Sequence, residues 1–390
     1  MKKLFLGIIY LCFTVCSFTQ ERIVIKHGPY LQNLKETEVT IVWVASSPSV
    51  GWVELAPDDN TSFYQQERPK YFNVTNGVKN TSLVHVVKLT GLMPGIKYRY
   101  RIYAQEVLEH QSWEIVYGRV AATNVYTAAP LSFTTGDRNK PEMSFIMIND
   151  IHGRAEDIPP MLQAADYKNA DMVFFNGDML SQLHDESGLF SGFMDTSIEL
   201  FASEIPMYYA RGNHETRGPF ATSFQHYFSP KEPRLYYLVR QGPVCFVVLD
   251  TGEDKPDSDI EYSGITDYDN YRTEQAEWLA EAVKSKDFIE AKFRIVIAHM
   301  PPVNGRAMWH GQKEVFDKFV PVLNEANVDV MLCAHLHRHL NNKPDADIKF
   351  PVIVNAHKTV LKGIAKNNQL ELVVMEMDGK VVDRINLNNK

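Results

Sequence analysis

The chain has 390 residues, of which 45% are hydrophobic and 23% are charged. These fractions match those of globular proteins and exclude a disordered, collagen-like or coiled-coil chain. At roughly 100 to 200 residues per domain, the length allows two or three domains. Lys and Arg number 40 against 48 for Asp and Glu, and the absence of a long basic run argues against nucleic acid as a standing partner.

Residues 1–20 have the features of a secretory signal peptide. Two lysines precede an apolar run over residues 4–16, and small or polar residues follow it. The run is shorter than the roughly 20 apolar residues of a membrane-spanning helix, and no comparable run follows. We therefore expect an exported protein, periplasmic, extracellular or on the cell surface, with no transmembrane anchor. A lipid anchor at Cys16 is not expected, because the residues before it are too large for a processing site.

The two cysteines beyond this leader, Cys245 and Cys333, each lie inside an apolar, strand-like run. Two cysteines cannot build a framework of several disulfides. The sequence therefore predicts two buried thiols.

Residues 21–135 have the pattern of a small β-sandwich. Short alternating strands, separated by turns and by no long amphipathic helix, are predicted at 39–44, 51–55, 83–89, 98–104 and 131–135. The stretch 89–100 resembles the corner of a fibronectin type III domain, in which Tyr98 closes the turn and Trp43 fills the core. The resemblance implies a fold only, so we expect both aromatic side chains to pack without a binding role.

After the polar residues 136–141, apolar runs alternate with helical segments, as in an α/β domain over residues 141–390. Strands are predicted at 145–148, 172–175, 206–209, 244–249, 294–297 and 328–333, and helices at 160–169, 274–284 and 313–325. Residues 370–377 and 381–387, joined by Asp378-Gly379, predict a β-hairpin, so the sheets should be mixed rather than purely parallel.

Polar residues follow five of these predicted strands. The candidate metal ligands among them are four histidines, two aspartates and one asparagine: Asp150, His152, Asp178, Asn213, His299, His335 and His337. Ligands of α/β sheets gather at the carboxyl ends of strands, so we expect these side chains to meet. Nitrogen and oxygen ligands without a thiolate suit Zn, Mn or Fe better than Mg or Ca alone. Seven side chains are too many for one ion and suit a two-metal site.

The same residues stand in motifs similar to those of the calcineurin-like metallophosphoesterase family, over about residues 143–340. The motifs are Asp150-x-His152, Gly177-Asp178, Gly212-Asn213-His214-Glu215, His299 and His335-x-His337. The resemblance implies a four-layer αββα sandwich with two divalent or trivalent metal ions. By position, it assigns one ion to Asp150, His152 and His337 and the other to Asn213, His299 and His335. Asp178 would bridge the ions, and His214 would stand beside them without binding metal.

The order of a fibronectin-like module and this domain is similar to that of purple acid phosphatases, with two departures. That subgroup has no histidine in the first motif and has a tyrosine ligand three residues after the second. Here His152 is present and Ser181 takes the place of the tyrosine. We therefore expect a colourless or weakly coloured enzyme that is not a true purple acid phosphatase. The Asp and Arg that protein phosphatases carry at and after the Ser181 position are also missing, which argues against a phosphoprotein substrate.

We expect an exported phosphomonoesterase that acts on small-molecule phosphate esters. A metal-bound hydroxide would attack in line at the Asp178-bridged centre, and His214 would protonate the leaving oxygen as general acid. A phosphodiesterase or nucleotidase of the same fold is the alternative. A non-catalytic surface- or carbohydrate-binding protein is disfavoured, because a decayed site should have lost at least one of the seven ligands. The metal identities, the oligomeric state and the role of the first domain stay open.

Further candidates lie near the third and fourth motifs. Arg217 and Arg211 could each bind phosphate through two N–H groups, with Arg217 the stronger candidate, although a solvated surface position is the simpler interpretation of both. Glu215 either orients His214 or forms a structural ion pair. Trp309 and His310 follow the fourth motif, in a loop where pocket walls often form.

Overall fold

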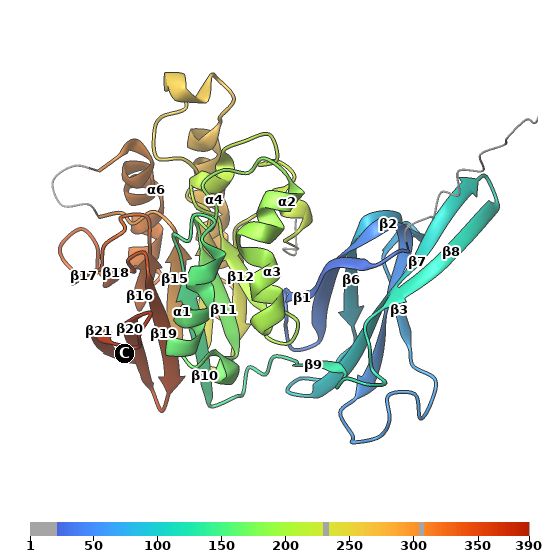
Figure 1. The fold of residues 1–390 in the computed structure, drawn as a ribbon. Helices are drawn as coiled ribbons and strands as arrows, with labels where there is room; N and C mark the ends of the chain where they lie inside the picture. The colour runs from blue at the N-terminus through green and yellow to red at the C-terminus, as the bar shows by residue number, and fades with distance from the viewer. Residues whose placement is uncertain (1–21, 229–233, 304–307, 390) are drawn as a thin grey trace, which may run out of the picture.

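The computed structural model describes residues 22–228, 234–303 and 308–389. The predicted signal peptide therefore lies outside the described residues. The described chain forms a β-sandwich followed by an α/β domain, which stand side by side (Figure 1).

The sandwich is built around one long, bent strand. Its strands are β1 (Ile25–Gln32), β2 (Glu38–Pro57), β3 (Lys70–Phe72), β6 (Thr81–Thr90), β7 (Lys97–Gln111), β8 (Glu114–Ala122) and β9 (Leu131–Thr134), with a small hairpin of β4 (Val74–Thr75) and β5 (Val78–Lys79). The first half of β2 pairs with β1 and β6, and its second half pairs with β3 and β7. The prediction of separate strands at 39–44 and 51–55 was wrong, because an irregularity between Val44 and Ser49 bends β2 without breaking it. The sequence pattern did not predict β1 and β8.

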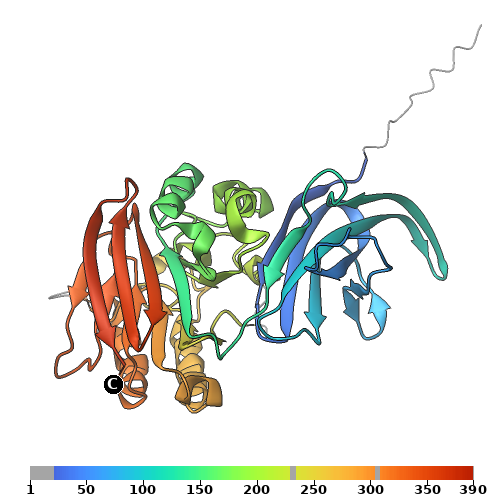
Figure 2. The same cartoon turned by 90° about the horizontal axis from the view of Figure 1, so that it is seen from below.

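The sandwich core contains the two aromatic residues singled out in the sequence. Trp43 is completely buried between the layers, and Tyr98 packs at the edge of the same cluster. The backbone N–H of Met93 donates to the hydroxyl of Tyr98 at 3.1 Å, which closes the turn before β7 as expected. Beyond this core the β7–β8 hairpin projects away from the rest of the molecule (Figure 2).

The second domain contains two six-stranded sheets. The first has the order β12 (Met207–Ala210), β11 (Met172–Asn176), β10 (Glu142–Ile148), β19 (Thr359–Lys366), β20 (Gln369–Glu376) and β21 (Val381–Asn388). The second has the order β13 (Tyr237–Gln241), β14 (Val244–Leu249), β15 (Phe293–Ala298), β16 (Val330–Cys333), β18 (Val352–Val354) and β17 (Leu340–Asn342). Both combine parallel and antiparallel pairs, and β20 and β21 form the predicted hairpin.

Three apolar clusters define the four layers of this domain. One lies between the two sheets. A second lies between the first sheet and the segment that includes α1 (Ile158–Ala164), α2 (Glu186–Leu189) and α3 (Asp195–Ser197). The third lies between the second sheet and α4 (Tyr268–Ala282), α5 (Lys286–Ile289) and α6 (His310–Glu325), and it contains the free, buried thiols of Cys245 and Cys333. This arrangement confirms the predicted αββα sandwich and the two buried thiols. In the described parts of the chain, every helix is too short or too polar to cross a membrane.

The two domains share buried contacts along β1 and β12. Tyr30 of the sandwich packs in the apolar cluster of the first sheet, and its hydroxyl donates to the carbonyl of Tyr227 at 2.9 Å. In the opposite direction, the hydroxyl of Tyr208 donates to the carbonyl of Leu34 at 2.9 Å. Separating the domains would expose these aromatic residues, so the interface contributes to the stability of both.

Candidate metal centre

The five motifs lie at one edge of the paired sheets. Strands β10, β11 and β12 run parallel in the first sheet, and β14, β15 and β16 run parallel in the second. Parallel strands end at the same edge, and each motif follows one of these strand ends within a few residues. The fold therefore brings together side chains that are far apart in the sequence. Asp150 and His337, for example, are 187 positions apart and form an ion pair.

Five of the seven predicted ligands have a left-handed backbone. Their φ angles are 54° for Asp150, 51° for His152, 54° for Asp178, 70° for His335 and 54° for His337. This conformation is uncommon for residues with a side chain and costs about 1–3 kcal/mol at each position. The left-handed conformation is thus concentrated in the predicted ligands. This indicates that the turns after the strands serve to position a functional site, at a cost in local stability.

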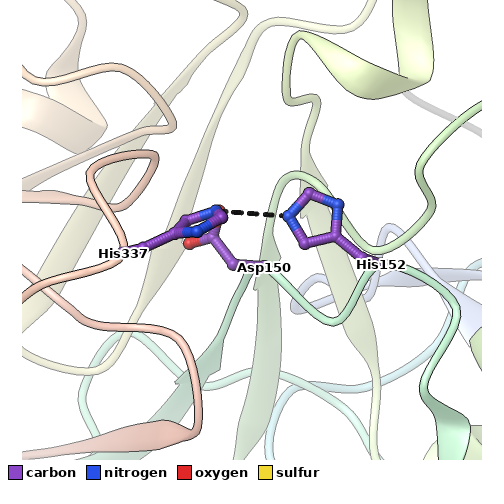
Figure 3. A group of neighbouring side chains, drawn as sticks. All are labelled: Asp150, His152 and His337. Atoms are coloured by element: carbon purple, nitrogen blue, oxygen red, sulfur yellow. Dashed lines mark hydrogen bonds and ion pairs between the residues drawn. The ribbon is translucent and has the colours of Figure 1, made fainter.

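Asp150, His152 and His337 form the first half of the cluster (Figure 3). Oδ1 of Asp150 lies 3.2 Å from Nε2 of His337 and 3.9 Å from Nε2 of His152. The two imidazoles face one another with 3.2 Å between their Nε2 atoms. Burial lowers the pKa of His152 to about 4, whereas the hydrogen bond with Asp150 raises the pKa of His337.

Asp178, Asn213, His299 and His335 form the second half. Oδ2 of Asp178 lies 3.1 Å from Nε2 of His299, and Oδ1 of Asn213 lies 3.1 Å from Nδ1 of His335. The carboxylate of Asp178 also belongs to a group with His152, within 4.8 Å, so it stands between the two halves. Burial, together with the charge of nearby His299, lowers the pKa of His335 to about 4.

His299 is fully buried, and its hydrogen bond fixes which ring nitrogen faces the centre. Nδ1 donates to the carbonyl of Asn176 at 2.7 Å, so Nε2 points toward Asp178. Burial alone would lower the pKa of His299, but the charge of Asp178 overrides it and raises that pKa to about 10. In return, His299 lowers the pKa of Asp178 against the effect of burial. This carboxylate is thus held ionised at neutral pH.

The donor set fits metal ions. Oδ1 of Asp150 and Nε2 of His299 are buried, and in the described structure their polar contacts are the ion pairs with His337 and Asp178, without a hydrogen bond of regular geometry. A metal ion would satisfy both atoms, which are costly to leave without a partner. At the centre, three groups of side chains each have possible ligand atoms that lie within 4.8 Å of one another. The groups are Asp150, His152 and His337; His152, Asp178 and His214; and Asp178, His299 and His335. All are imidazole or carboxylate groups, which bind Zn, Mn or Fe.

Two glycines allow the motifs to approach one another. A Cβ atom on Gly212 would lie 2.2 Å from Oδ1 of Asp178 and 2.4 Å from its backbone nitrogen. A Cβ atom on Gly177, where φ is +77°, would lie 2.5 Å from Nδ1 of His299. Both positions therefore require glycine, because any side chain there would displace a predicted ligand.

His214 lies beside the cluster with a defined orientation. Its Nδ1 donates to the carbonyl of Ser181 at 2.8 Å, and its Nε2 lies 3.9 Å from Oδ2 of Asp178. The ring packs edge-to-face with His152 at a centroid distance of 4.8 Å. Nε2 of His214 therefore faces the space in front of the cluster, where a substrate oxygen could contact it.

Among the described residues, Glu215 makes no ion pair and no hydrogen bond that orients the ring of His214. Its fully buried carboxylate accepts the backbone N–H groups of Asp178 at 2.9 Å, Leu180 at 2.9 Å and Gly212 at 3.0 Å. Burial raises its pKa, and the neighbouring carboxylate of Asp178 raises it further. The residue therefore ties the second motif to the third through the backbone.

Both arginines near the third motif are held by carboxylates. Nε and Nη2 of Arg217 donate to the carboxylate of Glu253, at 2.7 and 2.9 Å, which leaves the N–H groups of Nη1 and the second N–H of Nη2 for another acceptor. Arg211 lies 2.9 Å from Asp250 and is nearly buried rather than solvated. Of the two pocket-wall candidates, Trp309 is half exposed, and His310 pairs with Asp269 at 2.8 Å.

The calcineurin-like phosphoesterase family model matches residues 143–339, about half of the chain, and this range includes all five motifs. The chain belongs to the calcineurin-like phosphoesterase family. As a member of that family, this phosphoesterase is a hydrolase of phosphoric ester bonds.

Comparison with solved structures supports the order of the two domains. A purple acid phosphatase from yellow lupin (Lupinus luteus) seeds is similar to the phosphoesterase, with a TM-score of 0.68 and 16% identity over 92% of this chain and 74% of that chain. At this identity the likeness shows a shared fold. No curated protein sequence matches the phosphoesterase.

Two further solved structures overlap with the phosphoesterase less well. A 5′-nucleotidase from Candida albicans has a TM-score of 0.37 and 15% identity over 62% of this chain and 52% of that chain. The phosphoesterase YfcE from E. coli has a TM-score of 0.32 and 12% identity over 63% of this chain and 100% of that chain. At these TM-scores the likenesses support no conclusion.

Three buried asparagines of the phosphoesterase support the ligands and were not identified from the sequence. Nδ2 of Asn149 donates to Oδ2 of Asp150 at 2.7 Å, and Nδ2 of Asn355 donates to Oδ1 of Asn149 at 2.7 Å. Asn176 receives the hydrogen bond of His299 on its carbonyl. Asn149 and Asn176 each end an apolar strand directly before a motif, and that position was the signal that could have identified them.

Proposed function

We propose that this phosphoesterase is an exported phosphomonoesterase with two metal ions, drawn from Mn, Zn and Fe, that acts on small-molecule phosphate esters. The observation that carries the proposal is the position of Asp178, whose carboxylate stands between the two groups of imidazoles. A single carboxylate in this position suits a bridge between two ions.

Seven side chains would hold the ions. Asp150, His152 and His337 would bind one ion, Asn213, His299 and His335 would bind the other, and Asp178 would bind both. When bound, such ions supply Lewis acidity: they lower the pKa of water and neutralise the charge on phosphoryl oxygens. The hydrogen bonds to Asn176 and from Asn149 keep two of the ligand side chains oriented before substrate arrives.

His214 would give a proton to the leaving oxygen. Its Nδ1–H is committed to the carbonyl of Ser181, so Nε2 is the atom that would carry the transferred proton. An imidazole suits this role because its ordinary pKa lies near neutrality. Arg217 would bind the substrate from the same side through Nη1, which lies 3.5 Å from Nε2 of His214.

Export is proposed from the sequence of residues 1–20 alone. If these residues are removed during secretion, the mature protein recovered from the cell exterior or periplasm will begin near residue 21. Mass spectrometry of the mature N-terminus measures this directly. A protein that retains residue 1 and stays inside the cell would contradict the proposal.

The proposed activity is tested with the purified full chain, its metal content and a panel of esters. Chelation is expected to abolish hydrolysis of phosphomonoesters, and Mn, Zn or Fe is expected to restore it. Faster cleavage of diesters or nucleotides would instead favour a phosphodiesterase or nucleotidase. Full activity in a sample shown to be free of metal would overturn the two-metal proposal.

A further inference from the structure

The carboxyl end of β14 carries two acidic residues for which the sequence pattern predicted no role. Because β14 runs parallel to β15, its end lies at the same edge as the metal ligands. Asp250 directly follows the strand and pairs with Arg211 at 2.9 Å, and Glu253 pairs with Arg217 at 2.7 Å. This strand end therefore holds both arginines of the third motif.

Glu253 is almost completely buried, and its two carboxylate oxygens are saturated with donors. Oε1 accepts from Nε of Arg217 at 2.7 Å and from the hydroxyl of Thr216 at 2.7 Å. Oε2 accepts from Nη2 of Arg217 at 2.9 Å and from the hydroxyl of Tyr262 at 3.0 Å. A buried carboxylate with this many donors holds its partner in one geometry, because any other position would leave a charged group unsatisfied.

This geometry determines which N–H groups of Arg217 can bind a phosphoryl group at the centre. Nε and one N–H group of Nη2 donate to Glu253, and Nη1 lies 3.5 Å from Nε2 of His214. The side chain of Arg217 is 34% exposed, whereas that of Arg211 is only 11% exposed. The guanidinium of Arg211 also packs over the rings of Tyr268 and Tyr271.

We propose that Glu253 is a positioning residue of the centre: it fixes Arg217 so that Nη1 meets the phosphoryl group on the side of His214. The assignment rests on the phosphoesterase activity proposed above. Asp250 has no such role, because the arginine that it holds packs among aromatic rings.

The test uses the metal-loaded full chain and inorganic phosphate as the probe. Glu253→Gln keeps the size of the side chain but places an NH2 group against the donors of Arg217 and Tyr262. We expect it to weaken phosphate binding by about 10- to 100-fold, as Arg217→Ala should, because a hydrogen bond to a charged group is lost. The double variant should bind no more weakly than either single variant, because the two residues act as one unit.

Asp250→Asn is the matched control, since it removes a buried carboxylate that pairs with an arginine at the same strand end. It should leave phosphate affinity within about 3-fold of the wild type, since its arginine does not face the centre. Metal content and the melting temperature are measured for every variant, and a merely structural role of Glu253 would lower the melting temperature without selectively weakening phosphate binding. Wild-type affinity in Glu253→Gln, additive losses in the double variant, or an equal loss in Asp250→Asn would overturn the proposal.

Ester hydrolysis by the same samples separates this proposal from the proposed function. If the wild type binds phosphate in the expected pattern but cleaves no ester, the activity is wrong and the role of Glu253 stands. If the wild type cleaves esters and Glu253→Gln retains the full kcat/KM, the activity stands and the role of Glu253 is wrong.

Discussion

Glu215 follows His214 in the sequence, yet its carboxylate accepts the backbone N–H of Asp178 at 2.9 Å. The carboxylate of Asp178 contacts the imidazole of His299, whereas the backbone N–H of Asp178 donates to the carboxylate of Glu215. The left-handed φ of 54° at Asp178 is thus supported by a hydrogen bond from the third motif. Glu215 stabilises the turn that presents Asp178, the proposed bridging ligand.

Glu215→Gln should destabilise the protein and lower its metal content together. The amide NH2 cannot accept the backbone donors that the carboxylate accepts, so we expect a loss of about 2–3 kcal/mol in the free energy of unfolding. Urea unfolding and elemental analysis measure the two effects. Glu199→Gln, at an exposed position in the same domain, is the control and should change neither. Unchanged stability and metal content in Glu215→Gln would show that the three backbone contacts contribute little.

Asp178→Asn should lose more metal and more activity than Asn213→Ala. Asp178 is proposed to bind both ions, whereas Asn213 is proposed to bind one and contributes no charge. Elemental analysis of the two purified variants should give fewer ions per chain for Asp178→Asn, with a correspondingly larger fall in kcat/KM. Equal metal content in both variants would contradict the bridging position of Asp178.

His214→Ala should slow the hydrolysis of alkyl phosphates far more than that of aryl phosphates with an acidic phenol. An alkoxide needs a proton in order to leave, and general acid catalysis contributes about 10²- to 10⁴-fold, whereas a stable phenolate needs little help. The comparison is made within one variant, at metal content equal to the wild type. Equal losses on both esters would mean that His214 binds the phosphoryl group instead of protonating the leaving oxygen.

His85 should make the stability of the protein depend on pH. It is completely buried in the sandwich, stacked on Trp43, and burial lowers its pKa from 6.5 to about 4. The unfolded chain therefore binds a proton between these values that the folded chain does not, and stability falls as the pH drops below 6.5. From pH 7 to pH 5 this residue should cost about 2 kcal/mol of unfolding free energy.

Urea unfolding at the two pH values measures this contribution. His85→Gln should reduce the difference in unfolding free energy between pH 7 and pH 5 by about 2 kcal/mol. His110→Gln, at an exposed position of the same domain, is the control and should leave the difference unchanged. If His85→Gln keeps the full pH dependence, other groups are responsible for it.

The sequence by itself determined the chemistry of the centre. Strand ends, turn residues and the types of ligand side chain are local features, and they sufficed to predict an α/β domain and the residues that meet at its edge. The four-layer αββα arrangement and the places of Trp43 and Tyr98 came from the resemblance of the motifs to known families. The continuity of β2 was not predicted, since Ser46-Ser47-Pro48-Ser49 has the composition of a turn although the strand continues through it.

Only the tertiary structure decided which partners the buried charges take. Arg217 and Glu253 are 36 positions apart, and so are His214 and the Asp178 carboxylate that receives its backbone N–H. A local pattern cannot tell whether an acid near a motif will accept backbone N–H groups, as Glu215 does, or hold an arginine, as Glu253 does. A buried carboxylate must be satisfied by whichever donors the fold brings within reach, and those donors come from strands that meet only after the two sheets have packed.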